Sequence, residues 1–306
     1  MKMNLLLTGA FAYTEAQKEQ LKSLGAEITF VQDEREQLTI DVSQFDAVVC
    51  NGLFLKNDIG DFKSLRFIQA TSAGLDRMPL DYIKENGIVL RNARGVYSVP
   101  MAEFAVSGVL SLYKHTVRFL KNQETHAWVK DRGVRELAGD TVLIVGCGSV
   151  GTECAKRFKA FDMRVLAADI CRPTADCYDG YFPMDALSEA LSAADVVVLT
   201  LPLTEETRGM FGKTLFARCK SDAILVNLAR GAVVCEADLA DALQSGLLGG
   251  AVLDVFEIEP LPQDSPLWEM ENVLVTPHNS FVSPKNSERL FQCIYENLKA
   301  FSECNG

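Results

Sequence analysis

Short apolar runs alternate along the chain with longer segments whose apolar residues recur at helical spacing. Runs such as VVVLTL and AILVNL are apolar throughout, which is typical of parallel strands buried on both faces. Repeated strand–helix–strand units imply right-handed crossovers and a parallel sheet with helices on both sides. The pattern predicts strands at Asn4–Thr8, Glu27–Gln32, Ala47–Asn51, Phe67–Ala70, Ile88–Arg91, Thr141–Val145, Met163–Ala168, Val196–Leu201, Ala223–Leu228, Gly250–Val255 and Asn272–Thr276.

Two further helical segments set the domain organisation. A long helix is predicted at Val99–Asn122, between a first and a second set of strands. The last segment, Pro284–Phe301, is helical and has no strand after it, so we expect it to return to the first set. The predicted fold class is α/β, with two Rossmann-like doubly wound parallel-sheet domains, the second inserted into the first. The predicted boundaries are residues 1–98 and 283–306 for one domain and residues 99–282 for the other. Shorter helices are predicted at Thr14–Leu24, Val150–Phe161, Leu187–Ala193 and Glu236–Ser245.

A glycine-rich turn, GCGSVG, leads from the strand at 141–145 into a helix. Gly146 permits a tight turn, Gly148 lets the backbone approach a pyrophosphate, and Gly151 allows the helix to pack closely on the strand. The N-terminus of the helix favours phosphate charge. The next strand ends in Asp169, where a carboxylate accepts hydrogen bonds from a ribose and repels a 2′-phosphate. The motif therefore predicts a dinucleotide site for NAD, with NADP disfavoured; a tight turn without a ligand is the alternative.

Polar side chains follow three later strands of the same predicted sheet. They are Arg230, the pair Asp254 and Glu259, and His278. Each alone is more often an ion pair, a loop residue or a structural histidine than a catalytic group. Because open α/β sheets bind ligands at the carboxyl ends of their strands, their joint placement favours a catalytic site.

Composition limits the partners. The 306 residues contain 30 Lys and Arg against 41 Asp and Glu, a formal charge of -11, which disfavours nucleic acid and anionic membrane as partners. An anionic substrate therefore needs a local positive charge. The nine cysteines are scattered without metal-ligand spacing, so we expect reduced thiols, a cytoplasmic location and no metal. No apolar stretch reaches the roughly 20 residues of a membrane span, and the N-terminal run is too short for a signal peptide.

With these motifs in order, the sequence resembles the D-isomer-specific 2-hydroxyacid dehydrogenases, the group that includes phosphoglycerate dehydrogenase, D-lactate dehydrogenase and glyoxylate/hydroxypyruvate reductase. The resemblance covers nearly the whole chain and implies the same split fold. The segments that resemble the family are QATSAGLDRMPL (69–80), RNARGVYSVPMAEFAV (91–106), ELAGDTVLIVGCGSVG (136–151), LPLTEETRG (201–209), VNLARGAVV (226–234), LDVFEIEPLP (253–262) and NVLVTPHNSF (272–281).

The resemblance implies hydride transfer between NAD(H) and a small anionic 2-keto or D-2-hydroxy acid. His278 would be the general acid and base, with Glu259 orienting its ring. Arg230 would bind the substrate carboxylate, which is the local positive charge that an acidic protein needs. Asp254 would accept a hydrogen bond from the nicotinamide carboxamide. Substrate binding is assigned to Ser72, Ala73, Gly74, Arg230 and His278. Cofactor binding is assigned to Gly146, Gly148, Ser149, Val150, Gly151, Asp169, Leu201, Pro202, Thr207, Leu228, Ala229 and Asp254.

Other readings stay open. An NAD(H)-sensing scaffold of the corepressor type and a phosphite-type dehydrogenase share this fold, and a generic α/β binding protein would leave the polar placement to coincidence. Formate enzymes have Gln where Glu259 stands and are disfavoured. The TSAG loop differs from the version usual in phosphoglycerate dehydrogenases, and Phe281 departs from the small residues common after the histidine. Because the helix at 99–122 is apolar on much of its circumference, we expect a homodimer built around it, the alternative being burial within one chain.

Overall fold

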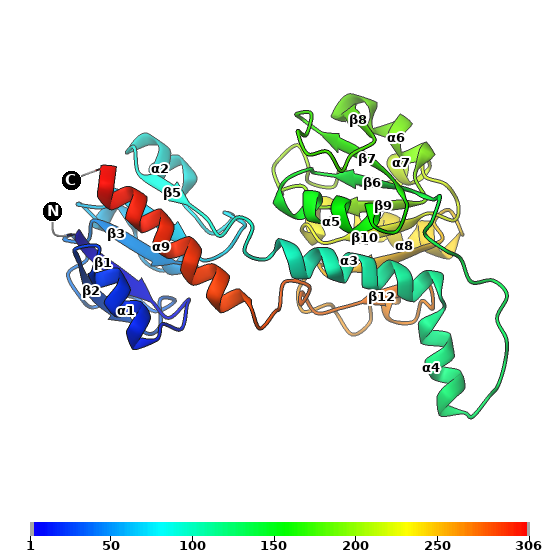
Figure 1. Ribbon diagram of the computed structural model, residues 1–306, viewed down its shortest axis with the longest axis horizontal. Coiled ribbons are helices and arrows are strands. Elements are labelled where there is room, and N and C mark those ends of the chain that lie inside the picture. Colours follow the sequence, from blue (N-terminus) through cyan, green and yellow to red (C-terminus); the bar gives the residue numbers. More distant parts are fainter. Residues whose placement is uncertain (1–2, 305–306) are drawn as a thin grey trace. The chain divides into compact units, whose positions relative to one another are not determined.

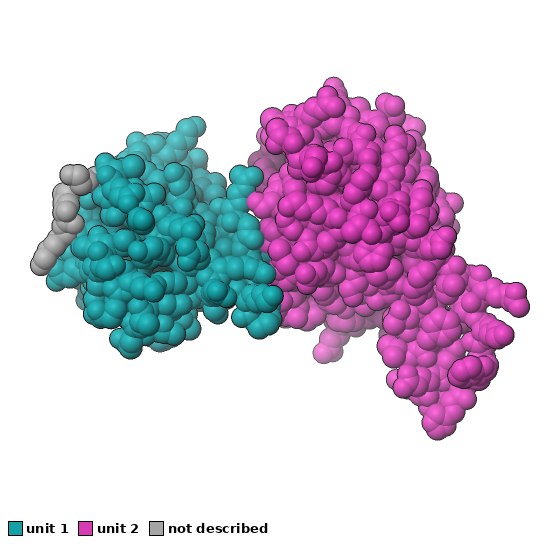
Figure 2. Space-filling view, in the orientation of Figure 1, with its two compact units in different colours: residues 1–97, 283–306 teal, residues 98–282 magenta. Residues whose placement is uncertain are grey.

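The computed structural model describes residues 3–304, which form two α/β units (Figure 1). Unit 1 contains residues 1–97 and 283–306, and unit 2 contains residues 98–282 (Figure 2). The sequence placed the first boundary one residue further along, between residues 98 and 99. The predicted fold class is confirmed, since each unit is built on a parallel sheet and unit 2 interrupts unit 1 in sequence.

Unit 1 has a five-stranded sheet in the order β2-β1-β3-β4-β5, and every pairing is parallel. Its strands are β1 (Met3–Thr8), β2 (Ala26–Val31), β3 (Ala47–Cys50), β4 (Phe67–Ala70) and β5 (Val89–Arg91). Its helices are α1 (Glu15–Lys22), α2 (Leu80–Glu85) and α9 (Asn286–Cys304), with short 3-10 helices at Leu53–Leu55 and Ile59–Asp61. Thr14 starts α1 with a capping box, in which its side chain and that of Gln17 bond each other's backbone N–H.

Helix α9 completes the core of unit 1. Its apolar residues recur every three or four positions and pack in one buried cluster with Leu5 and Leu7 of β1 and Leu21 of α1. As the sequence predicted, the last helix therefore belongs to the first unit. The α9 residues in this cluster are Leu290, Phe291, Ile294, Leu298 and Phe301.

Unit 2 has a seven-stranded parallel sheet in the order β12-β11-β10-β9-β6-β7-β8. Its strands are β6 (Thr141–Val145), β7 (Arg164–Asp169), β8 (Gly180–Pro183), β9 (Val196–Leu199), β10 (Ile224–Asn227), β11 (Gly250–Leu253) and β12 (Val273–Val275). Its helices are α3 (Ser98–Tyr113), α4 (Thr116–Glu124), α5 (Ser149–Lys159), α6 (Leu187–Ala193), α7 (Lys213–Phe216) and α8 (Glu236–Gln244), with 3-10 helices at Met184–Ala186, Gly231–Val233 and Pro266–Trp268.

The two faces of this sheet are covered by different helices. Alternate residues of each strand point to opposite faces, so Leu143 and Val145 join one core while Val142 and Ile144 join the other. Helices α6, α7 and α8 cover the first face, and α3 and α5 cover the second. None of the helices within residues 3–304 has the length and apolar character of a membrane span.

The predicted long helix at 99–122 is wrong in one respect: the structure has two helices there. His115 has a φ of 51°, in the left-handed region, and a helix of L-residues cannot continue through that conformation. The His115 ring is held by Asp131, whose carboxylate lies 2.8 Å from Nδ1 and also pairs with Arg118 at 2.8 Å. Helix α3 is buried against the sheet of unit 2, whereas α4 has no buried residue.

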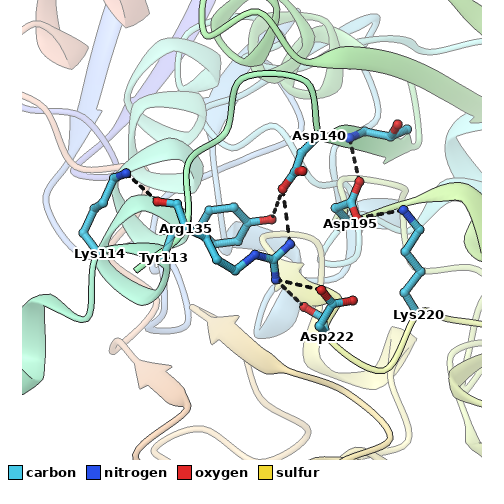
Figure 3. A network of polar contacts seen from close by, with 8 residues as sticks. Tyr113, Lys114, Arg135, Asp140, Asp195, Lys220 and Asp222 are labelled. Carbon is cyan, nitrogen blue, oxygen red and sulfur yellow. Dashed lines mark hydrogen bonds and ion pairs between the residues drawn. The ribbon is translucent and has the colours of Figure 1, made fainter. Parts of the chain in front are cut away.

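Helix α4 and the segment that follows it form an arm, residues 116–134, which extends away from the sheet of unit 2 (Figure 1). A polar network closes the base of the arm (Figure 3). Arg135 lies over the Tyr113 ring, 4.2 Å from its centroid, and pairs with Asp140 at 3.2 Å and Asp222 at 3.4 Å. Tyr113 donates to the same Asp140 carboxylate at 2.8 Å. Asp140 and Asp222 come just before β6 and β10, so the base of the arm is held at the amino ends of these strands.

Candidate active site

The glycine loop after β6 has the geometry that a dinucleotide requires. Gly146 has a φ of 92°, and a Cβ there would lie 2.5 Å from the backbone nitrogen of Leu201. A Cβ on Gly151 would lie 2.2 Å from the carbonyl oxygen of Gly146, so the helix packs closely on the strand. At Gly148 a Cβ would meet nothing within 4 Å, which leaves the backbone open to a ligand. Gly148 is the N-cap residue of α5 and makes no side-chain cap bond at this end of the helix, the end that favours phosphate charge.

The charges around this loop also suit a dinucleotide. The Asp169 carboxylate, at the end of β7, accepts hydrogen bonds from the backbone N–H groups of Cys147 and Ile170. It therefore lies against the glycine loop, where a ribose would sit. Burial raises the pKa of the Cys147 thiol to about 12, so this side chain is neutral and does not repel a pyrophosphate.

The other predicted cofactor residues lie on loops at the carboxyl ends of the strands or in the first turn of α5. Leu201, Leu228 and Ala229 belong to these loops, and their side chains are buried. Pro202 and Thr207 form an exposed turn, in which the Thr207 hydroxyl donates to the Pro202 carbonyl at 2.7 Å. Ser149 and Val150 are in the first turn of α5 and are partly buried.

Glu259 and His278 are brought together in unit 2. The Glu259 carboxylate lies 2.9 Å from Nδ1 of His278, and its other oxygen accepts from the Phe256 N–H at 3.1 Å. Both side chains are about two-fifths exposed, at 38% and 41%. Because Nδ1 is engaged, Nε2 is the ring nitrogen that remains to exchange a proton with a ligand. The Phe281 ring packs edge-on against the imidazole, with centroids 6.0 Å apart.

Asp254 is fully buried and holds the backbone around His278. One of its oxygens accepts from the Thr276 hydroxyl at 2.7 Å and from the Asn279 N–H at 2.8 Å. The other accepts from the Ser280 N–H at 2.9 Å. His278 has a φ of 50°, a left-handed conformation that costs free energy unless the surroundings fix it. The carboxylate fixes it by binding both residues that follow.

Arg230 follows β10 and is half-buried, with Nη1 donating to the Ala229 carbonyl at 2.7 Å. Asn227, the last residue of β10, is buried and shapes this turn. Its side chain accepts from the Ala229 N–H at 3.1 Å and donates to the Arg230 carbonyl at 3.3 Å. Sequence reasoning missed Asn227 and Thr276. The available signal was a polar residue at the end of an otherwise apolar strand.

The TSAG loop after β4 of unit 1 has its carbonyl groups engaged. Tyr97 donates to the Thr71 carbonyl at 2.6 Å, Ala93 to the Ser72 carbonyl at 2.9 Å, and Asn92 to the Ala73 carbonyl at 2.6 Å. The Ser72 hydroxyl donates to the Gly74 carbonyl at 2.8 Å. By contrast, the N–H groups of residues 72–74 donate to no residue within 3–304. The loop therefore presents donors, which is what an anionic group requires.

Comparison with known proteins agrees with these features. Residues 106–280, more than half of the chain, match the family described as D-isomer specific 2-hydroxyacid dehydrogenase, NAD binding domain. A hydroxypyruvate reductase from Thermotoga maritima is 34% identical over 259 residues, which are 82% of this chain and 83% of that protein. A D-3-phosphoglycerate dehydrogenase from Archaeoglobus fulgidus is 35% identical over 251 residues, 80% of this chain but only 47% of that protein.

Solved structures are similar over almost the whole chain. A D-isomer specific 2-hydroxyacid dehydrogenase family protein from Aeromonas salmonicida has a TM-score of 0.82 at 32% identity, covering 98% of this chain and 96% of that one. D-Lactate dehydrogenase from Aquifex aeolicus, solved with NAD and lactic acid, has a TM-score of 0.78 at 26% identity, covering 98% and 96%. The fold and the glycine loop define an NAD-dependent oxidoreductase. The chain belongs to the D-isomer specific 2-hydroxyacid dehydrogenases.

Proposed function

We propose that this enzyme interconverts a small 2-keto acid and the corresponding D-2-hydroxy acid, with His278, Glu259 and Arg230 as its catalytic residues. The contact that supports this most is the 2.9 Å pair between Glu259 and His278, formed by loops at the carboxyl ends of the strands in the NAD-binding unit. Such strand ends are where open α/β sheets carry out chemistry.

The pair fits proton transfer at a carbonyl oxygen. NADH, when bound, supplies the hydride that adds to the carbonyl carbon. His278 in its protonated form donates the Nε2 proton to the carbonyl oxygen, and in the reverse direction the neutral ring removes a proton from the hydroxyl group. Glu259 accepts a hydrogen bond from Nδ1–H in both forms, which fixes the ring and stabilises its positive charge.

Two groups are assigned to the substrate carboxylate. Arg230 has a planar fork of donors that matches a carboxylate. Its positive charge would also polarise the carbonyl group next to that carboxylate. Substrate binding by residues 72–74, whose N–H groups are presented as donors in unit 1, remains a prediction from the sequence. For the cofactor we propose NAD over NADP, because Asp169 stands where a 2′-phosphate would lie. The unpaired thiols of all nine cysteines support a reducing, cytoplasmic location.

Turnover of NADH with a panel of 2-keto acids tests this function. The panel contains glyoxylate, pyruvate, hydroxypyruvate, its phosphate, and branched and aromatic members, with a parallel series in NADPH. We expect Arg230→Ala to lower kcat/KM at least about 10²-fold, because it removes a charged donor at the reacting group. Arg164→Ala is the matched control, because Arg164 is exposed at the amino end of β7, whereas Arg230 follows the carboxyl end of β10. NADH binding without turnover of any acid would instead indicate a sensor or another donor.

We also propose that a second copy of the chain covers the arm. The arm exposes large apolar side chains that nothing in its own unit buries, while an ion-paired cluster, His115, Asp131 and Arg118, holds its conformation. Exposed apolar area of this kind marks association surfaces. The exposed residues are Val117, Phe119, Leu120, Trp128, Val129 and Val134, with Trp128 96% exposed.

Light scattering during gel filtration tests the dimer. We expect a particle of twice the 33.6 kDa of one chain, reduced to a monomer by Leu120→Glu, because the charge would be buried unpaired. Leu55→Glu is the control, since Leu55 in unit 1 is equally exposed, at 57% against 54% for Leu120. A wild-type chain that elutes at monomer mass at tens of micromolar would contradict the proposal.

A further inference from the structure

Two glutamates that are not among the proposed catalytic residues join the segment after Arg230 to the segment before Glu259. The backbone N–H of each donates to the carboxylate of the other. The Glu236 N–H donates to the Glu257 carboxylate at 2.8 Å, and the Glu257 N–H donates to the Glu236 carboxylate at 3.2 Å. Glu236 is the first residue of α8, which follows the loop of Arg230. Glu257 lies two residues before Glu259. The exchange therefore joins the arginine loop to the glutamate loop.

The same loops also meet backbone to backbone. A Cβ on Gly231, next to Arg230, would lie 1.8 Å from the carbonyl carbon of Phe256. Phe256 in turn donates its N–H to Glu259 at 3.1 Å. Close packing at Gly231 fixes the distance between the two loops. The two hydrogen bonds between Glu236 and Glu257 are a second point of attachment, which fixes the rotation of one loop relative to the other.

This arrangement has an electrostatic cost that a simple cap would avoid. Burial raises the pKa of the Glu236 carboxyl; the hydrogen bond from the Glu257 N–H lowers it, and the charge of Glu257, the smallest of the three effects, raises it. Position 235, where a Ser, Thr, Asp or Asn would cap α8 without a second acid, is Cys235 and makes no side-chain cap bond. The helix instead receives its cap from Glu257 of another loop.

We propose that Glu236 and Glu257 are positioning residues for the reaction: they hold the Glu259 loop in register with the Arg230 loop, and so hold the Glu259–His278 pair in place. This inference rests on the proposed function for the roles of Arg230, Glu259 and His278. Since a displacement of about 1 Å in a reacting group can cost about 10²-fold in rate, a loose loop would lower kcat without touching the NADH site.

Three variants test the positioning role. Glu236→Ala removes the acceptor, Glu236→Gln keeps an oxygen that accepts the Glu257 N–H, and Asp238→Ala is the control. Asp238 lies in the same first turn of α8, but its carboxylate accepts from the N–H of Lys213 at 2.9 Å, a residue of neither loop. We measure kcat, the NADH dissociation constant, Tm, and the Nδ1–H resonance of His278 in 15N-histidine-labelled protein, which has three histidines.

We expect Glu236→Ala to lower kcat about tenfold or more, to leave NADH affinity within about twofold, and to broaden the Nδ1–H resonance. Glu236→Gln should restore kcat and the resonance, and Asp238→Ala should affect Tm alone. Equal kcat and resonance in Glu236→Ala and wild type would overturn the proposal, as would equal losses in Asp238→Ala. If wild type reduces no keto acid, the proposed function fails, while the resonance still decides whether Glu236 positions Glu259.

The pH dependence of stability separates positioning from simple stabilisation. Because the pKa of Glu236 is raised on folding, its ionisation opposes folding, fully so only above the folded-state pKa. Glu236→Gln should therefore have a Tm at pH 7 that equals or exceeds that of wild type, with any excess lost below pH 4.5. A Glu236→Gln protein with a reduced kcat and a lower Tm at pH 7 would show that the carboxylate serves stability, against the proposal.

Discussion

Replacing His278 with asparagine is expected to lower kcat/KM for the preferred 2-keto acid by about 10²–10⁴-fold, the range that general acid–base catalysis contributes. Asparagine tolerates the left-handed backbone that His278 adopts, with its φ of 50°, so the loss would report the missing imidazole rather than a distorted turn. The dissociation constant of NADH and the Tm should change little, because within residues 3–304 the ring makes its polar contact with Glu259 alone. Steady-state kinetics measure kcat/KM, and fluorescence titration measures the dissociation constant of NADH, for the variant and for wild type.

The chain supplies a matched control for this substitution. His126 in the arm also has a left-handed backbone, with a φ of 54°, and lies outside the candidate site. His126→Asn should keep wild-type kcat/KM and Tm. A His278→Asn protein that retained a tenth or more of wild-type kcat/KM would exclude His278 as the proton donor, whatever the behaviour of the control.

Gly231→Ala is expected to destabilise the protein by about 3 kcal/mol or more and to lower activity together with stability. The added methyl group would lie 1.8 Å and 2.0 Å from the carbonyl carbon and oxygen of Phe256, and these backbone atoms cannot rotate away. The two loops must separate, which breaks the exchange between Glu236 and Glu257. At about 2–4 °C per kcal/mol, thermal unfolding should show a Tm lower by about 6–12 °C.

Gly148→Ala is the control for the effect of a methyl group alone. A Cβ at Gly148 meets nothing within 4 Å, so the Tm should stay close to that of wild type while NADH binding weakens. The two glycines would then separate two requirements, space for the neighbouring loop and space for the cofactor. A Tm of Gly231→Ala within about 2 °C of wild type would contradict the packing argument.

Much of this fold follows from hydrophobic patterning, and the failures have physical causes. Strand β8 was missed because Gly180–Pro183 is short, half-exposed and paired with β7 alone, as is typical of an edge strand ending in proline. The break between α3 and α4 was missed because the helical pattern continues through it without glycine. The His115 ring contacts Asp131, 16 residues further along the chain, and this contact leaves no mark on the helical pattern.

The candidate site was predicted only in part, because the sequence pattern gives the strand ends but not the path of the backbone after them. Residues at the carboxyl ends of parallel strands lie at one edge, so the approach of Glu259 to His278 could be expected. The role of Asp254 toward nicotinamide stays a prediction. In the structure its oxygens bind Thr276, Asn279 and Ser280, an arrangement that depends on the backbone after β12 and has no signature in a single sequence.

The return of α9 to unit 1 has a consequence for the order of folding during synthesis. Unit 2 is one continuous stretch of chain, so it can fold as soon as residue 282 has left the ribosome. The face of the unit 1 sheet formed by Leu5, Leu7 and Val49 has to wait for Ile294 and Leu298. Until α9 has been synthesised this nascent face lacks its cover, and it is therefore where chaperones would be needed.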